Sequence, residues 1–156
     1  MDESKLSPPV RRINEQVFLY HNAECTKIKV PEIGAAQAIW YDLAAIRTFY
    51  REIRNKHVSQ PIVYILACRI GPFMWWISRC IHKAGGTILI NPDGHEWMRG
   101  KWSKPVRAYW KWSEKLMVKY ADRVVCDSKH IEAYIRKEYH NYRPMTSYIA
   151  YGSDIA

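Results

Sequence analysis

Chemically active side chains are concentrated in one short segment, residues 91–105, which reads NPDGHEWMRGKWSKP. It holds carboxylates, an imidazole, basic groups and indoles, namely Asp93, His95, Glu96, Trp97, Arg99, Lys101 and Trp102. Carboxylates accept hydrogen bonds from hydroxyls, indoles cover the apolar faces of rings, and arginine or lysine binds phosphate. The combination is typical of a sugar-binding site.

Two other interpretations of this segment stay open at the level of sequence. It could be a structured surface loop, in which Asp93 and Gly94 make a turn and the tryptophans are hydrophobic anchors. A metal site built from Asp93, His95 and Glu96 is less favoured, because one short loop rarely supplies a complete ligand set. We therefore expect no metal and no cofactor in this chain.

Basic residues follow at four-residue spacing, which places them in one stripe along a helix. They are Arg107, Lys111, Lys115 and Lys119. The stripe is either a solvated helix face or a surface that faces the anionic head groups of a membrane. Nucleic acid is not the expected partner, because no known docking motif is present.

The elements that must position these residues alternate along the chain. Apolar runs and turn signals predict strands, at 16–21, 25–30, 62–67, 87–91, 124–126 and 147–151. Apolar residues at three- and four-residue spacing predict helices, at 35–55, 73–83, 105–121 and 128–139, the last capped by Ser128. The order predicts an α/β fold, a Rossmann-like parallel sheet with helices on both faces.

Two consequences follow from this predicted sheet. The continuous apolar run at 62–67 (IVYILA) is expected to be buried on both faces. In parallel sheets, ligands bind where the strands end, so the loop after Asn91 would lie at a functional edge.

Length and composition limit the possible classes of protein. The 156 residues fit one domain, which we expect at 16–156, with 1–15 as a loop or frayed lead. A net charge of +9 suggests an anionic partner. No stretch reaches the roughly 18 apolar residues of a membrane span. The four cysteines are widely separated, which favours buried thiols in a reducing compartment, the cytoplasm.

The segment NPDGHEWMRGKWSKPVRAYWKWSEKLMVKYADRVVCDS resembles the N-terminal domain of bacterial rhamnosyltransferases of capsule and cell-wall polysaccharide synthesis. These enzymes are retaining glycosyltransferases of the GT-B fold. Matching segments also occur at 28–45, 64–73 and 149–155. The family's glycine-rich first βα unit and its C-terminal donor domain have no counterpart here, so the chain resembles a fragment of such an enzyme.

The resemblance implies an activity for the intact enzyme: transfer of L-rhamnose from dTDP-rhamnose to a lipid-linked saccharide, at the inner face of the cell membrane. It implies that Asp93 and Glu96 are catalytic. It also implies a set of substrate-binding residues: Asn91, Gly94, His95, Trp97, Arg99, Lys101 and Trp102. The fragment alone is expected to be inactive. The alternative is a non-catalytic basic α/β module that binds an anionic membrane surface or nucleic acid.

Overall fold

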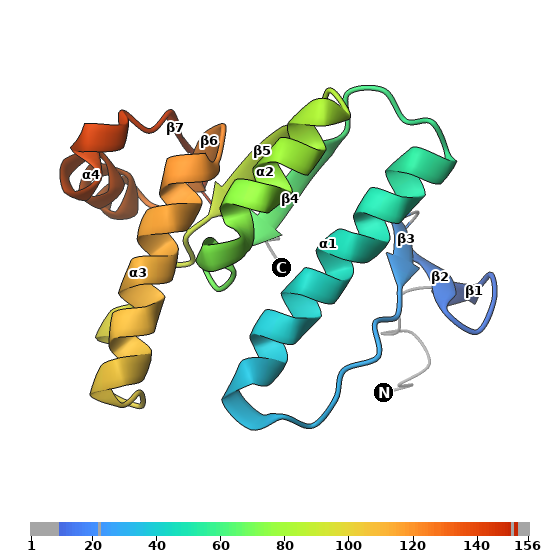
Figure 1. Ribbon diagram of the computed structural model, residues 1–156, viewed down its shortest axis with the longest axis horizontal. Coiled ribbons are helices and arrows are strands. Elements are labelled where there is room, and N and C mark those ends of the chain that lie inside the picture. The colour runs from blue at the N-terminus through green and yellow to red at the C-terminus, as the bar shows by residue number, and fades with distance from the viewer. Residues whose placement is uncertain (1–9, 22, 151, 153–156) are drawn as a thin grey trace, which may run out of the picture. The chain divides into compact units, whose positions relative to one another are not determined.

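The computed structural model describes residues 10–21, 23–150 and 152, and it divides into two compact units after Ala45 (Figure 1). The helix α1 (Gln37–Asn55) crosses the boundary between the units and is preceded by one 3-10 turn, η2 (Gly34–Ala36). The prediction of a helix at 35–55 is therefore confirmed apart from its first turn.

The first unit contains a small antiparallel sheet in the order β1-β2-β3. Its strands are β1 (Val10–Arg12), β2 (Val17–Tyr20) and β3 (Ala23–Thr26). The turn before β2 is held by Asn14, whose Oδ1 accepts hydrogen bonds from the backbone N–H groups of Gln16 and Val17, both at 2.8 Å.

This small sheet corrects two predictions. Residues 1–15 are not all loop, because β1 lies among them and pairs with β2; residues 1–9 lie outside the described part of the chain. The strand predicted at 25–30 begins earlier, at Ala23, and ends at Thr26. It pairs antiparallel with β2, so it is not a strand of the parallel sheet. Local alternation predicts a strand but not its partner.

The second unit confirms the predicted α/β class, with a four-stranded parallel sheet flanked by helices. The strand order is β4-β5-β6-β7. The strands are β4 (Ile62–Leu66), β5 (Thr87–Asn91), β6 (Arg123–Cys126) and β7 (Thr146–Tyr148). The connecting helices are α2 (Met74–Lys83), α3 (Lys104–Tyr120) and α4 (Lys129–Glu138). The Rossmann-like order of the sequence analysis therefore holds from residue 62 to residue 148, where β7 ends three residues before the predicted end at Tyr151, a residue outside the described part.

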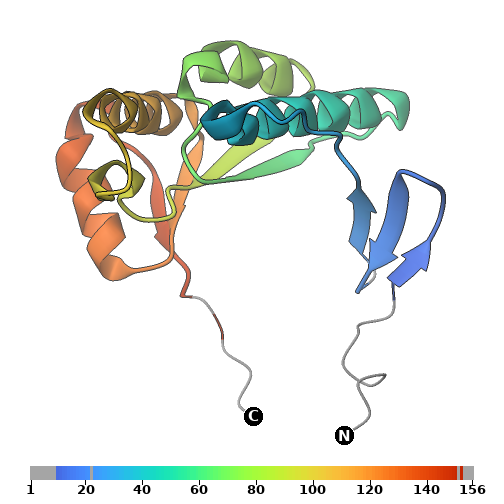
Figure 2. The same cartoon turned by 90° about the horizontal axis from the view of Figure 1, so that it is seen from below.

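One face of this sheet forms the core of the unit. Its side chains are buried, namely Val63, Ile65, Ile88, Ile90, Val124 and Cys126. Because the strand order follows the chain order, right-handed crossovers carry successive connections to the same face. Figure 2 shows α2 lying over this side of β4 and β5.

The opposite face of β4 is exposed, which contradicts the prediction that residues 62–67 are buried on both faces. Ile62 is 65% exposed, Tyr64 47% and Leu66 57%. The burial alternates along the strand, as in a sheet that is covered on one side only. The apolar run predicted the strand correctly. Burial of the second face of the strand would require another segment to pack against it, and an apolar run does not reveal whether one does.

Polar side chains secure the ends of two helices. The Ser128 Oγ caps α4, accepting a hydrogen bond from the Ile131 backbone N–H at 3.1 Å, as predicted. The Asp122 carboxylate accepts from the Ile88 backbone N–H at 2.7 Å and lies 3.0 Å from the His82 ring nitrogen. This aspartate therefore joins the end of α3 to β5 and α2.

Candidate functional site

The loop of residues 92–103 leaves the carboxyl end of β5 and leads into α3, as the sequence predicted. Its first turn is organised by Asn91, which is only 3% exposed. The Asn91 Oδ1 accepts a hydrogen bond from the Asp93 backbone N–H at 2.9 Å, and its Nδ2 donates to the Tyr64 hydroxyl at 3.3 Å. Asp93 and Gly94 have φ angles of 49° and 73°, so both lie in the left-handed region. Asn91, assigned to substrate binding, thus shapes the turn.

The turn presents the Asp93 side chain to solvent. Among the residues that the structure describes, its carboxylate has no hydrogen-bond or ion-pair partner. An aspartate tolerates the left-handed backbone better than most residues, which also fits a purely structural turn. Chemically, a free carboxylate at the end of a parallel strand can accept a hydrogen bond from a ligand hydroxyl.

Glu96 lies in the short 3-10 turn η4 (Glu96–Met98), and both of its carboxylate oxygens have partners. Its Oε1 accepts a hydrogen bond from the Trp102 indole N–H at 2.8 Å and lies 3.4 Å from the Lys101 ammonium. Its Oε2 lies 2.9 Å from the Arg99 Nε. Burial raises the pKa of Glu96, but the Trp102 hydrogen bond and the Arg99 and Lys101 charges outweigh it and leave the pKa below its usual value. The structure brings these four predicted site residues together as a cross-link within the loop.

His95 and Trp97 face inward, toward α3 and α4. The His95 ring makes an edge-to-face contact with Tyr134 of α4, with centroids 4.2 Å apart, and another with Trp97 at 5.9 Å. Within the described ranges, the buried His95 Nδ1 and Trp97 Nε1 have no hydrogen-bond partner. The Arg107 Nε donates to the Trp97 carbonyl at 2.8 Å, so α3 fixes the backbone of the loop.

Lys111 of α3 is enclosed by aromatic and acidic side chains. Its ammonium lies 4.6 Å from the centroid of the Trp97 ring, 2.7 Å from the Glu138 Oε1, and within 2.5 Å of the Tyr134 hydroxyl. Burial lowers the pKa of Lys111, but hydrogen bonds to Glu138 and Tyr134 outweigh burial and raise it overall. The Lys111 hydrogen bond in turn lowers the pKa of Glu138. The cation therefore ties the loop to α4.

The most buried acid of the site is Glu114, 3% exposed, which was not among the predicted site residues. Its Oε1 accepts hydrogen bonds from the Tyr134 hydroxyl at 2.6 Å and from the Tyr139 hydroxyl. Burial, together with the Glu114 charge, raises the pKa of both tyrosines. The sequence did hold a signal: Glu114 lies four residues after Trp110 and three before Met117, on the buried face of α3. A carboxylate at such a position requires partners.

The four basic residues of α3 do not form one exposed stripe. Arg107 and Lys111 are half-buried and bound to the loop, as described above. Lys115 and Lys119 are exposed, with the Lys119 ammonium 5.1 Å from the Tyr120 ring. Arg107 and Lys111 therefore differ in exposure from Lys115 and Lys119, and the membrane-facing role of the four residues stays a prediction. Arg107 is bound to the Trp97 carbonyl of the loop, and Lys111 is bound to Glu138 and Tyr134, which lie far from it in the sequence.

Exposed aromatic side chains at α2 were not part of the sequence interpretation. Phe73 is 43% exposed, Trp75 52% and Trp76 61%. The Arg79 guanidinium lies 5.0 Å from the centroid of the Trp75 ring. On α3, Trp112 is also 52% exposed. Tryptophans beside basic groups are common where a protein meets a membrane interface.

In the part of the chain that the structure describes, no three histidine, cysteine or acidic side chains are grouped so as to hold a metal ion. No helix among those residues has the length and apolar character that crossing a bilayer requires. Cys68 and Cys126 are buried, as expected, whereas Cys25 and Cys80 are partly exposed. Burial raises the pKa of the Cys68 and Cys126 thiols, that of Cys126 to about 11.

The chain matches the model of a known protein family. The family model described as a domain of unknown function, DUF1972, matches residues 8–154, nearly the whole chain. No curated protein matches the chain.

Proposed function

We propose that this chain, which belongs to the DUF1972 family, is the acceptor-side part of a glycosyltransferase. The family is associated with glycosyltransferase-related proteins, which supports the class. The resemblance of residues 91–128 to rhamnosyltransferases supports the finer proposal, transfer of L-rhamnose from dTDP-rhamnose to a lipid-linked saccharide in capsule or cell-wall polysaccharide synthesis. The nucleotide sugar would be bound by a donor domain, and the acceptor by the loop after β5.

One observation carries this proposal: the Asp93 carboxylate at the carboxyl end of β5 is exposed and has no partner among the described residues, on a turn whose backbone is held by the Asn91 side chain. This is the edge of a parallel sheet at which ligands bind. A carboxylate there can orient an acceptor hydroxyl by accepting its hydrogen bond. Positioning of that kind, with stabilisation of developing charge, is how a protein without a nucleophile of its own accelerates group transfer.

Glu96 has a different part in the proposal. Its oxygens are engaged by Trp102, Arg99 and Lys101, so its first role is to hold the loop in shape. The Arg99 and Lys101 side chains are each 55% exposed, which leaves their outer faces accessible to a phosphate. The proposed contacts are thus the Asp93 carboxylate to a hydroxyl and the two basic groups to phosphate.

The test uses the intact enzyme that contains this chain. A hydrogen bond to a charged group contributes about 1.5–3 kcal/mol, so Asp93→Asn should lower kcat/KM for rhamnosyl transfer roughly 10- to 150-fold. The melting temperature should stay the same, because the carboxylate has no partner among the described residues. Glu52→Gln, which removes an exposed carboxylate of α1, is the matched control and should retain activity. Full activity of Asp93→Asn would contradict the proposal and leave the turn with a structural role alone.

A second candidate function is docking on an anionic membrane surface, for which the exposed Trp75 and Trp76 of α2 and Lys115 and Lys119 of α3 are the supporting observation. It is compatible with transfer to a lipid-linked acceptor, and it would place the protein in the cytoplasm, peripheral to the inner face of the cell membrane. Membrane docking would also be the function of the chain under the alternative proposal, a basic module without catalytic activity. Nucleic acid stays outside the proposal, because no docking motif accompanies the charge.

A further inference from the structure

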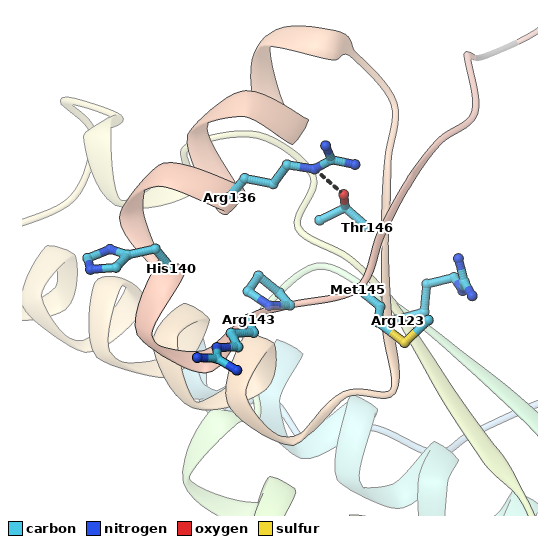
Figure 3. Close-up of a pocket in the computed structure, with 7 residues that line it drawn as sticks. Arg123, Arg136, His140, Arg143, Met145 and Thr146 are labelled. Atoms are coloured by element: carbon cyan, nitrogen blue, oxygen red, sulfur yellow. Dashed lines mark hydrogen bonds between the residues drawn. The ribbon is translucent and has the colours of Figure 1, made fainter.

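A pocket of about 370 Å³ lies at the amino ends of β6 and β7 (Figure 3). It is lined by Arg123, Arg136, His140, Arg143, Pro144, Met145 and Thr146. Arg123 is the first residue of β6 and Thr146 the first of β7. Because the sheet is parallel, this edge is opposite to the carboxyl end of β5 from which the candidate loop leaves. The pocket is therefore separate from the site described above.

The lining contains three guanidinium groups and no carboxylate. Arg143 is exposed, and its side chain has no ion-pair or hydrogen-bond partner within the described ranges. Arg123 donates one hydrogen bond, from Nη1 to the Ser147 Oγ at 2.8 Å. A guanidinium carries five N–H donors, so most of the donors of these two arginines are available to a ligand.

Arg136 is the most constrained of the three arginines. Its Nε donates to the Thr146 hydroxyl at 2.6 Å, and its Nη2 lies 2.8 Å from the Glu132 Oε1. The Thr146 hydroxyl also donates to Glu132, at 2.7 Å. Glu132 thus neutralises the Arg136 guanidinium and fixes its orientation, whereas no carboxylate among the described residues pairs with Arg123 or Arg143.

The backbone at Arg143 is unusual. Its φ of 48° and ψ of 53° are left-handed, although the next residue is Pro144, and a residue before proline is normally extended. Glycine or asparagine would adopt this conformation at lower cost. Strained backbone positions of this kind are concentrated at functional sites. Here the strained residue carries a guanidinium that has no partner among the described residues.

The arrangement of the arginines indicates the kind of anion. Figure 3 shows Arg136 reaching across to Thr146, whereas the side chains of Arg123 and Arg143 extend toward opposite sides of the pocket and do not converge on one point. A single phosphate would engage only part of this set. Arginine forks match phosphate oxygens in pairs, and a volume near 370 Å³ is in the range of small-ligand sites. We infer that this pocket binds a molecule that carries a diphosphate, at a site independent of the candidate acceptor loop.

Isothermal titration of the full chain with inorganic pyrophosphate tests the inference. We expect saturable binding that is weakened about tenfold by Arg143→Gln, the lower end of the effect of one charge-assisted hydrogen bond. Arg143→Gly should weaken binding equally while relieving the backbone, so a loss of affinity with a stable fold does not reflect misfolding. Arg79→Gln removes the same charge from α2 and should leave binding unchanged.

Two further titrations show whether the diphosphate belongs to a soluble nucleotide or to a lipid. ADP tests a soluble nucleotide, and phosphatidylcholine vesicles carrying farnesyl diphosphate test a lipid; binding of either one supports the site and names its source. No saturable binding of pyrophosphate by the unmodified chain would overturn the inference. So would equal affinity in Arg143→Gln, or an equal loss in Arg79→Gln, because the binding would then reflect only the net charge of +9.

Discussion

Asp93 and Glu96 are three residues apart in one loop, but their surroundings differ in kind. Asp93 is exposed on a left-handed turn with no partner in the described part of the chain, whereas Glu96 is bound on both oxygens. A group that contacts substrate needs free lone pairs, and a group that holds a loop needs occupied ones. At the residue scale the two carboxylates therefore have separate roles, although the resemblance assigns both to catalysis.

Glu96→Gln should therefore lower stability as well as any activity. At pH 7 we expect a loss of about 1 kcal/mol in the free energy of unfolding, because the ion pairs with Arg99 and Lys101 disappear while the Trp102 hydrogen bond can persist. The folded pKa of Glu96 lies below the ordinary value of 4.5. The stabilisation is therefore full above about pH 4.5 and is lost as the pH falls through the folded pKa. Urea denaturation of both proteins from pH 7 to pH 3 measures this.

The control for this experiment is Glu52→Gln, which removes a carboxylate of an exposed pair and should change stability by less than about 0.5 kcal/mol. A difference between wild type and Glu96→Gln that persists undiminished at pH 3 would show that the charge is not the cause.

At the scale of elements, α3 is held against the short turn η3 (Gly71–Phe73) by an unusually close backbone approach. The Gly71 N–H donates to the Ser113 Oγ at 2.8 Å, and the Tyr109 hydroxyl donates to the Arg69 carbonyl at 2.8 Å. A Cβ on Gly71 would overlap the Ser113 carbonyl oxygen and lie 2.6 Å from its Cα. This contact fixes the helix that carries Arg107, Lys111 and Glu114 under the loop.

Gly71→Ala should destabilise the protein by about 1–3 kcal/mol, because the obstructing atoms are backbone and cannot rotate away. The midpoint of urea denaturation measures the change. Gly100→Ala is the matched control, since a Cβ there meets nothing within 4 Å, and it should be neutral. If Gly71→Ala proved as stable as wild type, α3 would not depend on this contact.

Membrane docking is also a property of elements. If Lys115 and Lys119 face anionic lipid, each contributes about 1 kcal/mol at low salt, so the double change to glutamine should weaken binding to acidic vesicles roughly 30-fold. Lys137→Gln, an exposed position of α4, is the control. Vesicle co-sedimentation at two salt concentrations measures both proteins. Unchanged binding by the double variant would leave Lys115 and Lys119 as a solvated surface.

At the scale of the whole molecule, the parallel sheet has one covered face and, at β4, one exposed apolar face. The acceptor-side residues proposed above lie at its carboxyl edge, and the arginine pocket lies at its amino edge. The net charge of +9 favours anionic partners at either edge without distinguishing them. The proposed reaction also requires a nucleotide-sugar site, which the proposal assigns to a separate donor domain.

The chain of 156 residues should consequently show no glycosyl transfer when incubated with dTDP-rhamnose and a lipid-linked glucose acceptor. Product formation is followed by mass spectrometry of the lipid fraction. Measurable turnover by this chain would refute the proposed location of the donor site.

Local pattern determined most elements of this protein. Helical periodicity predicted α1 to α4 within a residue or two of their ends, apart from the first turn of α1, and apolar runs predicted β4, β5 and β6. Ser128 is the cap that its type and position indicated. The loop after Asn91 lies at the carboxyl end of β5 because strand–helix alternation permits few other arrangements. These features depend on neighbours in sequence, which is why sequence alone predicts them.

Tertiary structure decided what depends on distant partners. Only the fold shows that β3 pairs with β2 and that one face of β4 stays exposed. The enclosure of Lys111 by Trp97, Tyr134 and Glu138 joins three separate elements. Burial, ion pairing and pKa are set by the atoms that surround a side chain, and most of those atoms come from elsewhere in the chain. The sequence therefore determined which groups are present, and the fold decided which of them are free to act.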